Sequence, residues 1–374
     1  MEKLIVKNFG PIKEAEIDLT KYVVFIGDTS TGKSVLAKLI SIFRDFSNVV
    51  GNKYDDLDYE KELDLTNQLK NYNIDFDFED SYFEFSNSDL LITIEKKKIS
   101  NIRDGSEKIK LSNLEALGDF HNLEMKKTLL SLLNNTRKSI YFPPERILTS
   151  LIGSSISGLW ANNVALPVCF KNFAANYEVA RKEKQNVSFE DFGFSYAFVN
   201  NEELIYNPSG EFQLNKASSG IQSLLPLLLV LNHELRSEVL KPELNFLVEE
   251  PELNLFPIKQ KKLIDYLIQN ISKTNHKLII TTHSPYILSA LDTLILAKNT
   301  FDEHTSLKDV ISKIVFEQRW IDYNEISVYE VRNDGIVYSI KNEEFRSIDT
   351  NAIDKVSDII SEEFDKLTEL RYAQ

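Results

Sequence analysis

The stretch GDTSTGKS occupies residues 27–34, directly after the apolar run YVVFI at residues 22–26. Aromatic and β-branched residues in such a run predict a β-strand. Residues 35–43 follow the stretch with apolar side chains at helical spacing, which predicts an α-helix. A GxxxxGKS loop between a strand and a helix is the pattern of a phosphate-binding loop, and a chance glycine turn is the alternative. The stretch therefore predicts an α/β fold of the P-loop nucleotide-binding type.

The residues of this loop suit phosphate binding for separate reasons. Glycine lets the backbone curl so that successive N–H groups point at the phosphates, and the helix that follows adds the partial positive charge of its N-terminus. We expect Lys33 to reach the β- and γ-phosphates and the Ser34 hydroxyl to bind Mg²⁺. The predicted nucleotide-binding residues are Gly27, Asp28, Thr29, Ser30, Thr31, Gly32, Lys33, Ser34 and Val35.

Two adjacent carboxylates, Glu249 and Glu250, follow a second apolar run at residues 244–248. A run of this kind is typical of a buried parallel strand. Because successive residues of a strand point to opposite sides, the two carboxylates can serve two purposes. We expect Glu249 to bind Mg²⁺ and Glu250 to orient and deprotonate the attacking water. An acidic first turn of a helix after Pro251 is the alternative.

A third polar segment, THSP at residues 282–285, follows at the spacing of a β-α-β unit. Residues 258–271 predict an amphipathic helix and residues 277–281 predict the next buried strand. His283 is then expected at the carboxyl edge of the sheet, where open α/β sheets bind ligands. There its imidazole can contact a γ-phosphate or the attacking water. A capping turn before Pro285 is the alternative.

Three small residues, Ser218, Ser219 and Gly220, begin a predicted helix whose next residues, 224–229, are almost all apolar. Small residues leave the backbone N–H groups of a helix start accessible, which favours contact with an anion. A serine-capped core helix is the alternative.

These stretches resemble the ATP-binding-cassette ATPases of the chromosome-maintenance and repair class. That class includes the heads of structural-maintenance-of-chromosomes proteins, of RecF and of the double-strand-break repair ATPases. The sequence is most similar to bacterial relatives in the overcoming-lysogenization-defect group. The resemblance is carried over residues 1–290 by LIVKNFGPIKEAEIDL, GDTSTGKS, ASSGIQSLLPLL, FLVEEPELNLFP and IITTHSPYIL.

The resemblance implies an ATPase head with a mixed core sheet, a flanking antiparallel sheet and an inserted compact helical lobe. It also implies a signature motif that contacts the γ-phosphate of a nucleotide held by a second subunit. The chain is therefore expected to form a homodimer, or a higher even-numbered oligomer, around ATP and Mg²⁺. The signature residues implied by the resemblance are Ser218, Ser219, Gly220 and Gln222.

Two further segments are compared with the group. SIYFPPER, at residues 139–146, is similar to a Pro-Glu-Arg segment, which makes Glu145 and Arg146 candidate site residues. An ordinary strand-ending turn explains the two prolines equally well. No clear Q-loop glutamine is visible, because Gln68 lies in a polar helical stretch, so the residue opposite Ser34 at the metal stays open. Glu249 stands where transporter cassettes commonly have aspartate.

The remaining pattern divides the chain into four parts. We expect antiparallel strands within residues 82–110, mainly helix over about 120–190, and no long coiled coil, since no heptad repeat is sustained. Hairpins are expected at residues 194–206 and 326–340, followed by a closing helix at 349–370. The predicted parts are the first ATPase segment 1–145, the insertion 146–216, the second ATPase segment 217–297 and the C-terminal part 298–374.

Composition limits the function classes. The net charge of −14 argues against a surface coated with phosphate-binding lysines. Local basic runs at residues 96–98, 181–184 and 259–262 leave DNA contact possible, although a solvated face is the commoner explanation. The single Cys169 fits a core residue in a reducing compartment. Neither a membrane-spanning run nor a secretory start is visible, so a cytoplasmic location and no membrane partner are expected.

The last part of the chain contains no Glu-Gly dipeptide, which the nuclease domain of the resembled group requires. We therefore expect a slow ATPase that serves as sensor or scaffold for a separate effector, a nuclease or a toxin, in a bacterial defence or toxin system. The alternative is an ATPase of the RecF and chromosome-maintenance type that binds DNA directly. A transporter motor is disfavoured, because the first strand pair resembles the soluble branch of the family.

Overall fold

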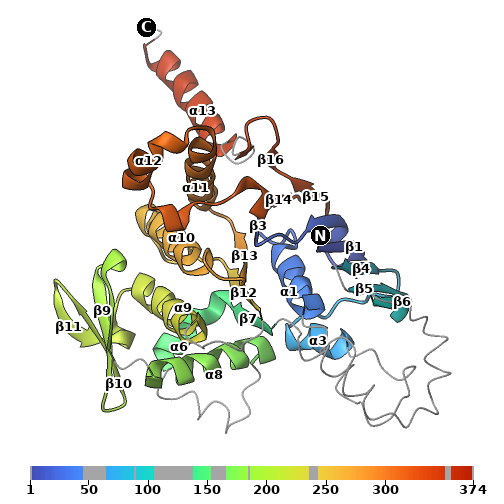
Figure 1. Ribbon diagram of the computed structural model, residues 1–374, viewed down its shortest axis with the longest axis horizontal. Helices are drawn as coiled ribbons and strands as arrows, with labels where there is room; N and C mark the ends of the chain where they lie inside the picture. Colours follow the sequence, from blue (N-terminus) through green and yellow to red (C-terminus); the bar gives the residue numbers. More distant parts are fainter. Residues whose placement is uncertain are drawn as a thin grey trace.

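The computed structural model describes residues 2–44, 65–87, 90–104, 138–152, 166–183, 186–235, 243–349 and 355–372. A six-stranded sheet with the order β15-β14-β3-β13-β12-β7 forms its centre (Figure 1). Neighbouring strands from β14 to β7 are parallel, and β15 is antiparallel to β14. The strands are β3 (Tyr22–Ile26), β7 (Lys138–Phe142), β12 (Leu244–Glu249), β13 (Lys277–Thr282), β14 (Ile326–Val331) and β15 (Val337–Ser339).

Helices and a second sheet bury both faces of this core sheet, which explains why its strands are largely apolar. Along β3, Val24 and Ile26 face a core shared with α9, α10 and α11, whereas Val23 and Phe25 face a core shared with α1 and the antiparallel sheet. The helices are α1 (Lys33–Arg44), α9 (Ser219–Leu235), α10 (Pro257–Ile271) and α11 (Pro285–Glu303). Alternate residues of β3 thus face opposite sides of the sheet, and α1, which begins directly after the P-loop, packs on the side of Val23 and Phe25.

A five-stranded antiparallel sheet lies on the α1 side (Figure 1). Its order is β2-β1-β4-β5-β6, and α3 (Leu65–Asn71) contacts α1 nearby. The strands are β1 (Lys3–Phe9), β2 (Ile12–Asp18), β4 (Tyr82–Ser86), β5 (Leu90–Glu95) and β6 (Lys98–Asp104). The mixed core sheet with a flanking antiparallel sheet confirms the predicted fold class.

The inserted region contains both helices and a further antiparallel sheet. α6 (Ile147–Ile152) and α8 (Val168–Glu183) each pack against α9. The sheet has the order β11-β10-β9-β8, with β8 (Asn186–Phe189), β9 (Phe194–Val199), β10 (Glu202–Asn207) and β11 (Gly210–Gln213). The predicted hairpin at residues 194–206 is present. The expectation of mainly helix over 120–190 is wrong at residues 138–142, which form edge strand β7, and at residues 186–189, which form β8. Residues 105–137 and 153–165 lie outside the described residues.

The C-terminal part contributes to the core more than its sequence indicates. The predicted hairpin is β14 and β15, and β14 pairs directly with β3. After α12 (Lys308–Ile314) and this hairpin, α13 (Lys355–Tyr372) extends away from the body (Figure 1). The description of this helix as a closing element is wrong, since Phe364, Leu367 and Leu370 are at least 66% exposed. Among the described helices, none has the length and apolarity needed to cross a bilayer.

Candidate functional site

The carboxyl edge of the core sheet brings three of the predicted motifs together. β3, β13 and β12 are neighbours, so the loops at their carboxyl ends are adjacent. Ile26 pairs with Thr282, and Thr281 pairs with Glu249. The P-loop, His283 and the Glu249-Glu250 pair therefore lie side by side, at the edge where parallel sheets bind ligands.

Two glycines of the P-loop occupy positions that other residues cannot take without strain. Gly27 has φ 154° and Gly32 has φ 108°. A Cβ on Gly27 would lie 2.2 Å from the carbonyl oxygen of Val331 in β14, and a Cβ on Gly32 would lie 2.5 Å from Ile12 Cδ1. The curl of the loop is thus required by its packing against β14 and the antiparallel sheet as well as by phosphate binding.

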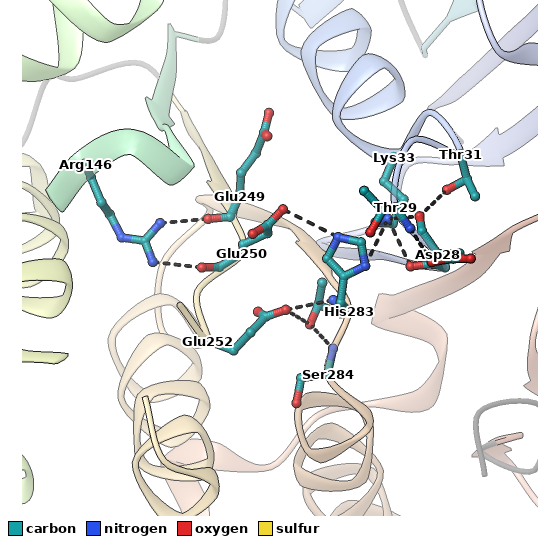
Figure 2. A network of polar contacts seen from close by, with 12 residues as sticks. Asp28, Thr29, Thr31, Lys33, Arg146, Glu249, Glu250, Glu252, His283 and Ser284 are labelled. Carbon is teal, nitrogen blue, oxygen red and sulfur yellow. Dashed lines mark hydrogen bonds and ion pairs between the residues drawn. The ribbon is translucent and has the colours of Figure 1, made fainter. Parts of the chain in front are cut away.

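The Lys33 ammonium folds back over the P-loop. Its Nζ donates hydrogen bonds to the carbonyls of Gly27 at 3.0 Å and Asp28 at 2.6 Å, and it lies 3.5 Å from His283 Nδ1 (Figure 2). Burial lowers the pKa of Lys33, while the charges of Glu250 and Asp28 act in the opposite direction. Within the loop, the Thr31 hydroxyl donates to the Asp28 carbonyl and the Thr29 N–H donates to the Asp28 carboxylate. The cation is therefore held at the mouth of the loop.

Glu249 is the buried member of the carboxylate pair. Its side chain is turned to the α1 face of β12, where Tyr141 donates a hydrogen bond to it at 2.9 Å and Lys38 Nζ lies 3.9 Å away. Burial raises the pKa of Glu249, and Lys38, Ser34 and Tyr141 act to lower it. A buried carboxylate with one distant ammonium as its cationic partner is an environment that a metal ion would stabilise.

The donors at this position fit Mg²⁺. Ser34 and Glu249 supply a hydroxyl and a carboxylate oxygen, which are hard ligands, and Ser34 is near enough to lower the pKa of Glu249. No cluster of three or more potential metal-ligating side chains occurs among the described residues.

Glu250 points the other way and meets His283. Its Oε1 lies 3.5 Å from His283 Nε2, and its backbone N–H donates to the Thr281 carbonyl at 2.9 Å. Its φ of 43° is in the left-handed region, which non-glycine residues seldom adopt. This turn separates the two carboxylates: Figure 2 shows Glu249 and Glu250 directed to different sides of the strand end.

His283 is positioned by a residue that the sequence analysis did not select. Glu252 Oε1 accepts hydrogen bonds from the His283 backbone N–H and from the Thr282 hydroxyl, both at 2.7 Å (Figure 2). Ser284 caps α11 by accepting from the Tyr286 N–H. The capping turn considered above is therefore present, and it leaves the His283 ring between Lys33 and Glu250. The sequence signal for Glu252 was its place as the last carboxylate of the Glu-Glu-Pro-Glu segment at residues 249–252.

Tyr141 and Lys38 were also missed. The register of β7 and β12 pairs Tyr141 with Leu247, two residues before Glu249, which places the two side chains on the same face. Lys38 lies one helical turn after Ser34 in α1, so helical spacing alone could have indicated it.

The predicted signature residues divide into exposed and buried members. Ser218 and Ser219 are exposed at the start of α9, and the Ser218 carbonyl accepts the Gln222 N–H at 3.0 Å. A Cβ on Gly220 would lie 2.9 Å from the Asn254 carbonyl oxygen, so the small residue permits a close approach within the chain. Gln222 is buried, and its amide donates to the carbonyls of Leu214 and Asn215.

The Pro-Glu-Arg segment and the basic runs make other contacts. Glu145 is exposed, whereas Arg146 is buried and donates to backbone carbonyls that include those of Glu249 and Glu250. Lys259 and Lys262 donate to carbonyls at residues 192 and 191 respectively. Cys169 is buried, and burial raises its pKa to about 11, as expected for an unreactive core thiol.

Comparisons with known proteins place these motifs in a family. A family model described as an AAA ATPase domain matches residues 1–150 and 154–288. A search of the curated proteins found no match. Among solved structures, the head domain of a structural-maintenance-of-chromosomes protein from Thermotoga maritima is 14% identical, with 77% of this chain and 90% of that chain covered at a TM-score of 0.38. The recombination mediator RecF is 13% identical, with 90% and 97% covered at a TM-score of 0.35.

Proposed function

Because the chain belongs to the AAA ATPase domain family, we propose that it binds ATP with Mg²⁺ at the carboxyl edge of the core sheet and hydrolyses it slowly. The observation that carries the proposal is the short chain of contacts from Lys33 through His283 to Glu250. His283 Nδ1 lies 3.5 Å from Lys33 Nζ, and His283 Nε2 lies 3.5 Å from Glu250 Oε1. Three motifs distant in sequence thus converge where a γ-phosphate and an attacking water would meet.

Each of these groups has a distinct role in the proposed reaction. The P-loop N–H groups and Lys33 bind the β- and γ-phosphates. Glu250 orients the attacking water and accepts its proton, and His283 contacts the γ-phosphate or that water. Ser34 and Glu249 would hold Mg²⁺, which neutralises charge on the phosphates. Glu249 and Glu250 can have separate roles, because the first is buried near Ser34 and the second faces His283.

The start of α9 supports a shared site. Ser218 and Ser219 are exposed at the N-terminus of a 17-residue helix, where hydroxyl and N–H groups can contact an anion from outside the chain. Together with Gly220 they would complete the site of a second subunit, giving a homodimer or a higher even-numbered oligomer. Gln222 would support this surface from beneath, because its amide holds residues 214 and 215 in front of the helix.

The biological role proposed is that of a sensor or scaffold for a separate effector, a nuclease or a toxin, in a bacterial defence or toxin system. The resemblance to the overcoming-lysogenization-defect group supports this role. Direct DNA action of the RecF type is the alternative. Duplex DNA binding that strengthens with ATP and weakens with salt would favour the alternative over the scaffold role.

Replacing the proposed base tests the reaction. Glu250→Gln keeps the size of the side chain but cannot accept the proton, so turnover should fall by about 100-fold or more, while ATP should hold the subunits together. Phosphate release measures the first effect, and mass by light scattering with and without ATP measures the second. Glu211→Gln, at an exposed position of β11, is the matched control and should behave as the wild type. Full turnover of Glu250→Gln would remove Glu250 from the role of base.

A further inference from the structure

Arg146 is the largest fully buried side chain among the described residues, with 1% of its surface exposed. It closes the short 3₁₀ helix Pro144–Arg146 that follows β7. Its guanidinium donates to backbone carbonyls of separate segments of the chain. Figure 2 shows two of these contacts, to Glu249 and Glu250. The contacts are Nη1 to Glu249 at 2.8 Å, Nη2 to Glu250 at 2.8 Å, Nε to Ser223 at 3.1 Å and Nη1 to Pro143 at 3.2 Å.

Two of these carbonyls flank the left-handed turn at Glu250. The turn directs the Glu250 carboxylate toward His283, away from the side on which Glu249 lies. Such a backbone conformation persists where surrounding contacts hold it. The guanidinium supplies two of those contacts, since its planar fork donates to both carbonyls at once, and the Glu250 N–H bond to Thr281 supplies another. Burial lowers the pKa of Arg146 to about 10, so the group remains a cation at neutral pH.

The third carbonyl belongs to α9. Ser223 lies one helical turn after Ser219, so the same guanidinium joins the start of α9 to the Glu250 turn. Other contacts strengthen this connection. The Ser150 hydroxyl of α6 donates to the Gln222 carbonyl at 2.7 Å, and Gly220 closely approaches the Asn254 carbonyl. The exposed serines and the carboxylate beside His283 are thus parts of one hydrogen-bonded unit.

We propose that Arg146 is a positioning residue that couples the start of α9 to the Glu250 carboxylate within one subunit. This inference rests on the proposed function. When Ser218 and Ser219 contact the phosphate of a second subunit, the resulting shift of α9 reaches Glu250 of their own subunit through Ser223 and Arg146. Each active site of the dimer then depends on the occupancy of the other, so hydrolysis should be cooperative in ATP concentration.

Arg146→Lys tests the coupling, because a single ammonium cannot hold three segments in the geometry of the guanidinium. ATP affinity at the P-loop and ATP-dependent dimer formation should remain within about threefold of the wild type. The kcat should fall by at least about tenfold, and the dependence of rate on ATP concentration should change from sigmoidal to hyperbolic. A purely structural role would lower the amount of folded protein without changing the shape of this curve. Arg319 donates hydrogen bonds to Gln269 and Asp265 away from the site, so Arg319→Lys is the matched control.

A milder variant decides the matter if Arg146→Lys does not fold. Ser150→Ala removes the hydroxyl that holds the Gln222 carbonyl and leaves every Arg146 donor in place. It should reduce the cooperativity of hydrolysis with a loss in kcat of about two- to tenfold, the range of one hydrogen bond. Wild-type kcat and wild-type cooperativity in the folded variant, either Arg146→Lys or Ser150→Ala, would overturn the proposal. Failure of the proposed function is distinguishable, since the wild type itself would then neither hydrolyse ATP nor dimerise with it.

Discussion

The carboxyl edge of the core sheet and the start of α9 both carry motif residues, but the structure holds them differently. At the sheet edge, Lys33 and Glu249 are buried, and their charged groups contact partners within the chain. At the start of α9, Ser218 and Ser219 are exposed, while the next turn, beginning with Gln222, is buried. The first region is held together by contacts within the chain. The second presents groups outward, as expected of a surface that another molecule completes.

The largest effect should come from removing the cation of the sheet edge. Lys33→Ala removes the charged donor to the phosphates, so ATP affinity should fall by about 100-fold, the range of a charge-assisted hydrogen bond. Calorimetry or a fluorescent ATP analogue measures the loss. Lys98→Ala, on the exposed part of β6, is the control and should bind ATP as the wild type does. Unchanged affinity of Lys33→Ala would mean that the edge does not bind the phosphates.

A change at the start of α9 should separate binding from hydrolysis. Ser219→Arg places a long cationic side chain at the exposed helix start, leaving the P-loop of the same chain intact. ATP binding should be unchanged, whereas turnover should fall by about 100-fold, because the second subunit can no longer approach. Ser209→Arg, in the exposed turn between β10 and β11, is the control. Undiminished hydrolysis by Ser219→Arg would show that one chain contains a whole site and would remove the contrast between the two regions.

The same contrast explains what the sequence could predict. The P-loop, the paired carboxylates and His283 were found because each follows a strand, and parallel strands bring their carboxyl ends together. The P-loop glycines were predictable as well, because the curl of the loop needs positive φ. The contacts of Tyr141 and Arg146 depend instead on which strands and helices become neighbours in the folded chain. The local pattern of a sequence does not predict those neighbours. β14 illustrates the point, because its pairing with β3 joins segments about 300 residues apart.

The α9 serines show the opposite limit. The sequence predicted a helix start of small residues, and the structure contains it. However, Gly220 is small because the Asn254 carbonyl of its own chain lies close, and Gln222 is turned inward. A motif that is read as one surface thus combines two exposed residues with two that fix the helix in place. Burial, which needs the tertiary structure, is what separates them.

The smallest predicted effect concerns the pH dependence of the sheet edge. Burial raises the pKa of Glu249, and the hydrogen bond from Tyr141 acts to lower it. Tyr141→Phe removes that bond, so the pKa of Glu249 should rise further. Because Mg²⁺ and a proton compete for this carboxylate, Mg²⁺-dependent ATP binding weakens as pH falls through its pKa. The acid limb of binding should therefore move to higher pH in Tyr141→Phe, as measured by Mg²⁺ titrations between about pH 5 and 8. Tyr206→Phe, on the exposed part of β10, is the control and should leave the acid limb of binding unchanged. If the acid limb of Tyr141→Phe is also unchanged, Glu249 does not bind the metal as a carboxylate. The sheet edge would then lack one of the two metal ligands proposed for it.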